Sequence, residues 1–352
     1  MCFLLSISYF RSMILVTGAT GLVGSHLALQ LIENGENIRA IYRNSTSKMA
    51  TKSLFELYGK GNLFKKIEWI QADITDVPSL EIAFANVDSV YHCAALISFD
   101  PKDEALLRKT NIEGTANIVN FSIANCVKKL CFVSSIAALG DLKEHEIRIT
   151  ETTDWNPEKP HSDYAISKYG AEMEIWRGQQ EGLKVAILNP GIILGPGFWN
   201  KGSGALFSAV ANGLPFYTKG FTGFVAVSDV VALLILAMDK MEVDDNNNGQ
   251  RFVIIEDNYS YETILNAIAE ALKVKKPKFY ASKWITEIAW RLNWITSELF
   301  YQKRKISKDS ARSSHSTSLY SNEKVKSVFG FQFKNSIIYI NEIIALQSKK
   351  II

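Results

Sequence analysis

Two side chains four residues apart, Tyr164 and Lys168, are the pair in this sequence best suited to moving a proton. On a helix, residues at this spacing share one face. A free phenol has a pKa of about 10, and lowering it to about 7 requires roughly 4 kcal/mol of preferential stabilisation of the phenolate. An adjacent ammonium group supplies part of that stabilisation. The pair therefore predicts an acid–base group that exchanges a proton with a carbonyl or alcohol oxygen.

Neighbouring strand ends carry two further candidates. Ser135, with Ser134 beside it, lies where the strand expected over 129–134 ends, and its hydroxyl is expected to hold the substrate oxygen. His92 lies at the end of the strand expected over 87–93. A lone histidine in such a place is more often a packed residue than a ligand or a base, so we favour packing.

Three glycines spaced three residues apart follow the apolar segment 13–17 and open an amphipathic helix expected over 22–33. Gly18 permits a tight turn, Gly21 lets a pyrophosphate approach the backbone, and Gly24 lets the helix pack closely on the strand. The N–H groups at the helix N-terminus then face the phosphates. Rather than an ordinary turn, we predict a dinucleotide site that includes Thr17, Gly18, Thr20, Gly21, Leu22, Val23 and Gly24.

The end of the second expected strand, 37–42, indicates which dinucleotide binds. An NAD site usually has an acidic residue about 20 residues after the glycines, where it binds the ribose 2′-hydroxyl. Residues 37–48 contain no acid and carry Arg39, Arg43 and Lys48 instead. Because a guanidinium group can donate two parallel hydrogen bonds to a 2′-phosphate, Arg43 favours NADP(H) over NAD(H).

Strands and helices alternate along residues 13–255, which is typical of a parallel sheet covered on both faces. We predict an α/β fold with a Rossmann-type, doubly wound parallel sheet. Further cofactor contacts are expected at strand ends: Asp73 and Ile74 after 67–72, Ala94 and Ala95 after 87–93, and Pro190 after 183–189. The expected division of the chain is a dinucleotide-binding domain over 13–190, completed by 224–255, and a smaller, mainly helical substrate-binding part over 191–223 and 256–352. Residues 1–12 are expected to be a disordered or non-native extension, because the first strand begins directly at Met13.

Composition excludes several classes of protein. The 352 residues are 47% hydrophobic, enough for a large core, and the net charge of +3 is too small to indicate nucleic acid or an anionic membrane as the partner. The cysteines have no metal-ligand spacing, so no metal is predicted, and Cys93, Cys126 and Cys131 are expected to be small core residues. A reducing cytoplasm is the expected compartment.

The C-terminal part has two unusual segments. Residues 284–301 are apolar almost all round, and we expect a buried core helix or a lid over the substrate pocket, with contact to a membrane surface or a dimer face as the less favoured alternative. A basic cluster follows, made up of Lys303, Arg304, Lys305, Lys308 and Arg312. Aromatic residues do not interleave with it further along the chain, so we interpret it as a solvated face rather than a nucleic-acid site.

Taken together, these motifs resemble those of the extended short-chain dehydrogenases/reductases, also called the NAD-dependent epimerase/dehydratase superfamily. The resemblance is carried by 17–24 (Thr-Gly-Ala-Thr-Gly-Leu-Val-Gly), 92–95 (His-Cys-Ala-Ala), Asn111, 134–135 (Ser-Ser), 164–168 (Tyr-Ala-Ile-Ser-Lys) and 189–197 (Asn-Pro-Gly-Ile-Ile-Leu-Gly-Pro-Gly). It covers residues 13–255, and the remainder only loosely. Residues 38–43 make the chain most similar to dihydroflavonol-4-reductase-like and 3β-hydroxysteroid dehydrogenase-like members.

What the resemblance implies is a set of roles. Ser135, Tyr164 and Lys168 would be catalytic, with Asn111 as a proton-relay or structural partner. Lys168 would also bond the nicotinamide ribose, and Leu96 would contact the substrate together with Ser135 and Tyr164. Ser135 is favoured over Ser134 because the family's serine stands five residues before a glycine, as Ser135 does before Gly140. A homodimer through the helices of Asn111 and Tyr164 is suggested by the family alone.

Departures from the family patterns narrow the activity. Dehydratases carry Thr-Asp-Glu where this chain has Ser134-Ser135-Ile136, and epimerases place an arginine where it has Thr222, seven residues before Asp229. The expected pocket segments supply few cations for a diphosphate, so an apolar ketone or aldehyde fits better. We predict an NADP(H)-preferring oxidoreductase acting on a small carbonyl or alcohol substrate. The alternatives are an NAD-dependent nucleotide-sugar epimerase and a non-catalytic protein that senses the cofactor.

Overall fold

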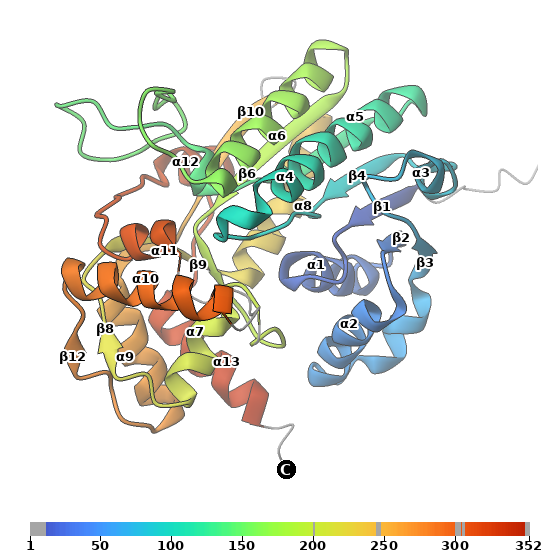
Figure 1. Ribbon diagram of the computed structural model, residues 1–352. Coiled ribbons are helices and arrows are strands. Elements are labelled where there is room, and N and C mark those ends of the chain that lie inside the picture. The colour runs from blue at the N-terminus through green and yellow to red at the C-terminus, as the bar shows by residue number, and fades with distance from the viewer. Residues whose placement is uncertain (1–11, 200, 244–247, 300–303, 305–306, 349–352) are drawn as a thin grey trace, which may run out of the picture.

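The computed structural model describes residues 12–199, 201–243, 248–299, 304 and 307–348 (Figure 1). The described strands are β1 (Met13–Thr17), β2 (Asn37–Tyr42), β3 (Glu68–Gln71), β4 (Ser89–His92), β5 (Lys129–Val133), β6 (Lys184–Pro190), β7 (Ile192–Leu194), β8 (Phe216–Tyr217), β9 (Phe221–Ala226), β10 (Gln250–Ile254), β11 (Asp257–Ser260) and β12 (Phe279–Tyr280). The helices are α1 (Leu22–Glu33), α2 (Ser45–Leu57), α3 (Val77–Phe84), α4 (Glu104–Leu107), α5 (Gly114–Ala124), α6 (Asp163–Gln180), α7 (Gly204–Ala211), α8 (Val227–Val243), α9 (Tyr261–Leu272), α10 (Lys283–Leu299), α11 (Lys308–Ser313), α12 (Glu323–Phe329) and α13 (Ser336–Ser348). A π-helical turn, Arg108–Glu113, joins α4 to α5.

A seven-stranded parallel sheet forms the centre of the molecule, in the order β10-β6-β5-β4-β1-β2-β3. The strand order reverses between β1 and β4, so the chain segments that follow these two strands run to opposite faces of the sheet. Ligands of open α/β sheets bind in the crevice at such a switch point. The predicted doubly wound parallel sheet is confirmed.

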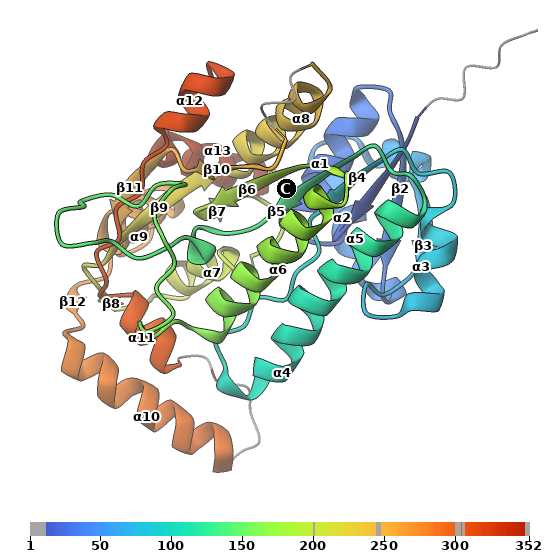
Figure 2. The same ribbon diagram turned by 90° about the horizontal axis from the view of Figure 1, so that it is seen from above.

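Helices cover both faces of this sheet, as Figures 1 and 2 show. Ile14 and Val16 of β1 belong to the core cluster that includes α1 and α8, whereas Leu15 belongs to the cluster with α3, α5 and α6. Since successive side chains of a strand point to opposite faces, one apolar run supplies both layers. The expected bounds of β1, α1 and β2 agree with the structure, because each segment is set by its own local pattern.

The rest of the chain forms a second core beside the carboxyl ends of the strands. β7 and β11 pair with β9, while α7, α9 and α13 pack around Phe207, Phe224 and Ile340. The expectation of a mainly helical part over 256–352 did not include β11 and β12, because these short strands are formed by pairing with distant segments.

Helix α10 differs from its expected burial. Its only fully buried described side chain is Ser297, whereas large apolar side chains such as Trp284 and Leu292 are exposed. Of the two favoured expectations, the buried core helix is wrong, because the periodicity of a sequence marks an apolar face but not what covers it, and the lid over the substrate pocket stays a prediction. The prediction also included Phe300 and Tyr301, which lie outside the described residues, as do Lys303, Lys305 and residues 1–11. Within the described residues, no helix combines the length and the apolar content needed to cross a bilayer.

Two further residues lie where the sequence did not place them. Cys126, expected in the core, is exposed in the turn after α5, where its φ of 54° breaks the helix. Arg39, expected near the cofactor ribose, is buried in the sheet, pairs with Glu68 at 2.9 Å and donates to the carbonyl oxygens of Ala83 and Ala85. Arg39 therefore holds α3 against β2 and β3.

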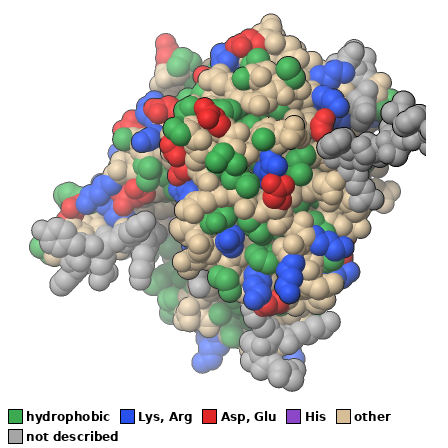
Figure 3. All heavy atoms as spheres, turned by 90° about the vertical axis from the view of Figure 1, so that its right-hand side faces the viewer, with side chains coloured by type: hydrophobic (Ala, Val, Ile, Leu, Met, Phe, Trp, Pro, Cys, Tyr) green, Lys and Arg blue, Asp and Glu red, His purple; other side chains and the backbone are tan. Residues whose placement is uncertain are grey.

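Figure 3 shows the side of the molecule that lies on the right in Figure 1. Basic and acidic side chains are both spread over this face, and hydrophobic side chains are scattered between them. A mixed surface of this kind gives no single-sign field that would attract a nucleic acid.

Candidate functional site

One large cavity, with a volume of about 2150 Å³, runs from the glycine turn past the ends of the central strands to α11. The predicted residues that line it are Gly18, Thr20, Gly21, Leu22, Val23, Gly24, Arg43, Asp73, Ile74, Ala94, Ala95, Leu96, Ser135, Tyr164, Lys168 and Pro190. Thr17 and Asn111 are not part of its lining. The topology thus gathers, into one cavity, predicted residues that are up to 172 positions apart in the chain.

The glycine turn is held by close backbone contacts. Gly18 has a φ of +68°, and a Cβ atom there would lie 2.5 Å from the backbone nitrogen of Ala94. A Cβ atom at Gly24 would lie 2.3 Å from the carbonyl oxygen of Gly18. Both positions therefore require glycine, one because β4 passes beneath the turn and the other because α1 packs onto it.

Gly21, in contrast, faces open space. A Cβ atom there would meet only the Gly18 oxygen, at 3.4 Å, and Gly21 is the N-cap of α1 without a side-chain hydrogen bond. The first N–H groups of a helix have no partner within the helix, so this end of α1 can receive an anion. The cavity, the open glycine and the helix N-terminus fit the diphosphate of a dinucleotide.

Thr17 has a structural rather than a lining position, which differs from the prediction. It is fully buried, its hydroxyl bonds Nδ1 of His92 at 2.7 Å, and it accepts the N–H of Ala94 at 3.2 Å. Nε2 of His92 bonds Thr115 at 3.0 Å, and burial lowers the pKa of His92 to about 3. His92 is thus the packed, neutral histidine that was expected.

Asn111 lies in the π-helical turn and is almost fully buried. Its side chain accepts the N–H of Leu96 at 2.7 Å and donates to the Leu96 carbonyl oxygen and to Ser167, each at 2.9 Å. These bonds occupy both the oxygen and the nitrogen of the side-chain amide. The geometry therefore favours the structural one of the two predicted roles, in which Asn111 holds the loop after β4 against α6.

Arg43 and Asp73 lie at the end of the cavity formed by β2 and β3. Arg43 is exposed, directly before Asn44, which is the N-cap of α2. Within the described residues its guanidinium group has no hydrogen bond or ion pair, so it is available to an anion. Asp73 Oδ1 accepts the N–H and the hydroxyl of Thr75, each at 2.9 Å, which orients the carboxylate.

The proton-moving candidates meet at the other end of the cavity, after the carboxyl end of β5. Tyr164 lies in the first turn of α6, and the hydroxyl that acts on its pKa is that of Ser135, the N-cap of a short 3-10 turn. Ser134 points elsewhere, because its hydroxyl donates to Glu172 at 2.5 Å. The hydroxyl next to Tyr164 is therefore that of Ser135, the serine favoured from the sequence.

The electrostatics of this end are dominated by burial. Burial raises the pKa of Tyr164, and the hydrogen bond from Ser135 offsets part of this rise. In the protein without cofactor, Lys168 therefore does not produce the lowered tyrosine pKa that was expected from the sequence. Lys168 itself is almost fully buried, donates to the Val133 carbonyl oxygen at 2.9 Å, and has a pKa lowered to about 7, chiefly by burial.

Glu172 is the important residue that sequence reasoning missed. It has no exposed surface, and it accepts hydrogen bonds from Ser134 at 2.5 Å, Asn189 at 2.5 Å and Arg251 at 3.1 Å. All three partners are donors, which matches an ionised carboxylate. Its charge also raises the pKa of Lys168 against the effect of burial. The spacing of four residues between Lys168 and Glu172 was the available signal.

The far wall of the cavity comes from the C-terminal part. It includes Arg304, Arg312 and a group of serines: Ser307, Ser310, Ser313, Ser314, Ser316 and Ser318. The expectation of few cations around the pocket is therefore wrong. The cause is that Arg304 and residues 307–318, which the sequence did not place at the pocket, line it opposite α6 and the loop after β4.

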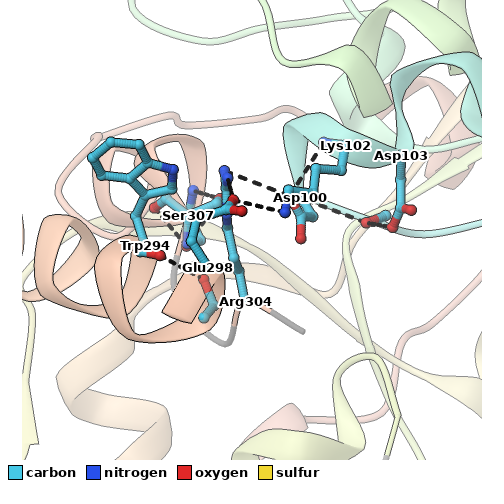
Figure 4. A network of polar contacts seen from close by, with 10 residues as sticks. Asp100, Lys102, Asp103, Trp294, Glu298, Arg304 and Ser307 are labelled. Carbon is cyan, nitrogen blue, oxygen red and sulfur yellow. Dashed lines mark hydrogen bonds and ion pairs between the residues drawn. The ribbon is translucent and has the colours of Figure 1, made fainter. Parts of the chain in front are cut away.

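A polar network joins this wall to the loop after β4 (Figure 4). Lys102 pairs with Glu298 at 2.6 Å, while Arg304 pairs with Glu298 at 2.8 Å and with Asp100 at 3.6 Å. Two of the cations near the pocket are thus already neutralised by carboxylates. The network holds the end of α10 against the loop that carries Leu96 and Phe99.

Comparisons with known proteins agree with this geometry. The model of the family described as "NAD dependent epimerase/dehydratase family" matches residues 14–254. A protein of Synechocystis sp. named as a dihydroflavonol 4-reductase is 28% identical over 280 residues, which are 78% of this chain and 77% of that protein.

Two solved structures have the same fold. UDP-glucose 4-epimerase from Thermotoga maritima, solved with UDP-glucose, has a TM-score of 0.75 and 22% identity, covering 97% of this chain and 100% of that one. Yeast methylglyoxal/isovaleraldehyde reductase, solved with NADPH, has a TM-score of 0.71 and 19% identity, covering 96% and 98%.

The chain belongs to the NAD-dependent epimerase/dehydratase family, because the family model matches more than half of it. It is an NAD(P)-dependent enzyme of the extended short-chain dehydrogenase/reductase type, and the resemblance to dihydroflavonol reductases drawn from its motifs is confirmed.

Removing the Glu172 carboxylate should destabilise the protein strongly. Glu172→Ala removes the acceptor of the Ser134 hydroxyl and one of the two acceptors of Asn189 and of the half-buried Arg251, and it leaves the Arg251 charge without its carboxylate partner, so we expect the free energy of unfolding to fall by about 3–5 kcal/mol. Glu174→Ala, on the same helix but paired with Arg177 near the surface, should cost less than about 1 kcal/mol. Urea unfolding measures both, and equal losses would contradict the account.

The buried Lys168 should make stability depend on pH. Its pKa is about 7 in the folded protein and 10.5 as an ordinary side chain. Between these values the unfolded chain binds more protons, so this group makes the folded state more stable as the pH rises. We expect Lys168→Met to be more stable than the natural protein at about pH 7, and this advantage to shrink toward about pH 10.

Thermal unfolding without cofactor, over that pH range, measures the effect. Lys52→Met serves as the control, because Lys52 is a surface residue paired with Glu56. A constant difference between Lys168→Met and the natural protein at every pH would show that Lys168 is not buried as a titrating amine.

Proposed function

We propose that this protein is an NADP(H)-preferring reductase of ketones or aldehydes on fairly apolar small molecules. The observation that supports this most is that Tyr164, Ser135 and Lys168 line the same cavity as Arg43. This cavity joins a proton donor, a cofactor cradle and a cation that can receive a 2′-phosphate.

The residues of the chain supply binding, orientation and the proton. Ser135 donates a hydrogen bond to the carbonyl oxygen of the substrate, and Tyr164 transfers the proton that turns this oxygen into a hydroxyl. The cofactor, when bound, supplies the hydride that the carbonyl carbon accepts. Lys168, when charged, favours the phenolate that remains on Tyr164, and the charge of Glu172 raises the pKa of Lys168 against the effect of burial.

The cofactor is expected to lie along the strand ends. The turn at Gly18 and Gly21 and the N-terminus of α1 would hold its diphosphate, and Asp73 would meet the adenine. Arg43 would bind the 2′-phosphate of NADP(H), since two parallel N–H bonds to a dianion are stronger than contacts to a hydroxyl.

The substrate is expected in the remainder of the cavity. Leu96, Phe99 and Trp199 offer apolar contacts near Tyr164, and the Phe99 ring lies 5.7 Å from that of Tyr164. The serine-rich wall could accept polar substituents of such a molecule. We also propose that 191–223 and 256–352 form the substrate-binding part, that the protein forms a homodimer, and that it works in the cytoplasm.

A nucleotide-sugar epimerase that uses NAD is the second candidate. Arg312 on the cavity wall is a cation suited to a diphosphate, and the relatives include a UDP-glucose 4-epimerase of Vibrio cholerae. This function predicts an NAD molecule that stays bound through purification and no net consumption of NADPH. A protein that only senses the cofactor would not need the arrangement of Ser135, Tyr164 and Lys168.

Replacing Arg43 should remove the preference for NADPH over NADH. In Arg43→Ala we expect the affinity for NADPH to fall about tenfold to a hundredfold, because a charge-assisted bidentate contact is lost, while the affinity for NADH is unchanged. Titrations followed by cofactor fluorescence measure both. Lys52→Ala is the matched control, because Lys52 lies in the following helix, α2. Equal affinities in the natural protein, unaffected by the change, would reject the 2′-phosphate site.

Removing the Tyr164 hydroxyl should abolish proton transfer but not cofactor binding. We expect Tyr164→Phe to lower kcat about 10²- to 10⁴-fold on the best carbonyl substrate found, with an unchanged dissociation constant for NADPH. The matched control is Tyr169→Phe on the same helix, whose ring stacks on Trp155 at 4.4 Å. A Tyr164→Phe protein with nearly full kcat would remove Tyr164 from the mechanism.

A further inference from the structure

Helix α10 presents an unusual row of apolar side chains to solvent. We call this row the α10 stripe and define it as Trp284, Ile288, Leu292, Ile295 and Leu299. Their exposed fractions range from 46% to 68%. The spacings of four, four, three and four residues keep all five on one face of the helix. Scattered exposed apolar residues are common, but an aligned row of five over four turns needs an explanation.

The opposite side of α10 is anchored to the protein. Ser297 is buried, and Thr286 forms a hydrogen bond with His315 at 2.9 Å. Figure 2 shows α10 at the edge of the molecule beside α11, away from the central sheet. The helix is therefore held in place by one side, and the α10 stripe is left on the outer side. Within the described residues, no segment covers it.

Aromatic side chains extend this surface beyond the start of the helix. Phe279 on β12 is 61% exposed, and its ring lies 6.0 Å from that of Phe216 on β8, which is also exposed. Tyr280 is exposed as well. Trp and Tyr rings are enriched where proteins meet the headgroup region of a bilayer. Exposed aromatic residues thus directly precede α10 in the chain.

The charge around the α10 stripe is positive. Residues 273–299 contain six Lys and Arg but only two Glu. Lys273, Lys275 and Lys278 are exposed directly before the aromatic residues. Glu287 pairs with Arg291, Glu298 with the network of Figure 4, and Lys276 with Glu270. Four lysines of this stretch therefore have no ion pair within the described residues: Lys273, Lys275, Lys278 and Lys283. An apolar face flanked by basic residues matches the chemistry of an anionic lipid surface.

We propose that α10 and the β8–β12 pair dock this protein onto the surface of an anionic membrane. The α10 stripe and Phe279 would enter the boundary between headgroups and acyl chains, and the lysines before them would face the lipid phosphates. The same helix contributes Ser297 and Glu298 to the cavity wall, so docking would place that wall next to the lipid. Docking itself does not depend on the reaction proposed above.

Sedimentation with vesicles tests this proposal with the full chain. Vesicles of phosphatidylcholine mixed with phosphatidylglycerol are compared with vesicles of phosphatidylcholine alone. We expect the protein to sediment with the anionic vesicles and to need at least about tenfold more of the neutral ones. The triple variant Trp284→Ser, Ile288→Ser, Leu292→Ser should lose binding to both kinds, with an unchanged affinity for NADPH.

Two controls separate the contributions. Ile82→Ser with Ile338→Ser removes equally exposed apolar side chains from α3 and α13, and binding to vesicles should remain. Lys275→Gln with Lys278→Gln should weaken binding to anionic vesicles about tenfold and leave neutral vesicles unaffected. Thermal unfolding confirms that each variant is folded.

Three outcomes would overturn the proposal. The natural protein could fail to sediment with anionic vesicles, or the triple variant could bind as well as the natural protein. The third outcome is a dimer that dissociates in the triple variant while neither protein binds vesicles, as measured by sedimentation equilibrium. That result would assign the α10 stripe to a second copy of this chain.

Discussion

The buried carboxylate of Glu172 holds together the half of the molecule that carries Tyr164 and Lys168. The carboxylate lies on α6 and receives hydrogen bonds from Ser134 at the end of β5, Asn189 in β6 and Arg251 in β10. A buried charge is costly unless it is fully paired, so these four elements have to meet in one register. Tyr164 and Lys168 lie on the same helix, and their positions above the strand ends follow from this arrangement.

The opposite half of the cavity depends on backbone contacts instead of charge. The turn at Gly18 touches the backbone at Ala94, and α1 touches the turn at Gly24, at distances that no side chain would allow. These contacts bring the helix N-terminus to the switch point of the sheet. The two halves are joined across the loop after β4, which Asn111 holds at Leu96 and the network around Arg304 holds at Asp100. Cofactor and substrate would therefore share one continuous cavity.

Local patterns made much of this fold predictable. The bounds of β1, α1 and β2 follow from apolar periodicity and glycine, and the parallel order of strands brings Ser135 close to Tyr164 without knowledge of any contact. What the sequence could not show are partners far apart in the chain. Glu172 and Arg251 are 79 residues apart in the chain. The ion pair with Glu68 keeps Arg39 away from the expected cofactor site.

The C-terminal part was predicted least well for the same reason. Amphipathic periodicity identified a helix near Trp284, but whether its apolar face meets a core or solvent depends on residues elsewhere. A core position for α10 was therefore predicted wrongly, and the polar wall of the cavity was missed because Arg304 and residues 307–318 approach it only through the tertiary fold.

The central claim is that this protein transfers hydride to a carbonyl compound and releases the alcohol. The most direct measurement uses NADPH deuterated at the transferable position of the nicotinamide, a panel of aldehydes and ketones, and mass spectrometry of the products. The account predicts an alcohol that carries one deuterium, formed in amounts equal to the NADPH consumed. It would be contradicted by protein that is purified with one tightly held NAD per chain, consumes no NADPH with any member of the panel, and inverts a nucleotide sugar.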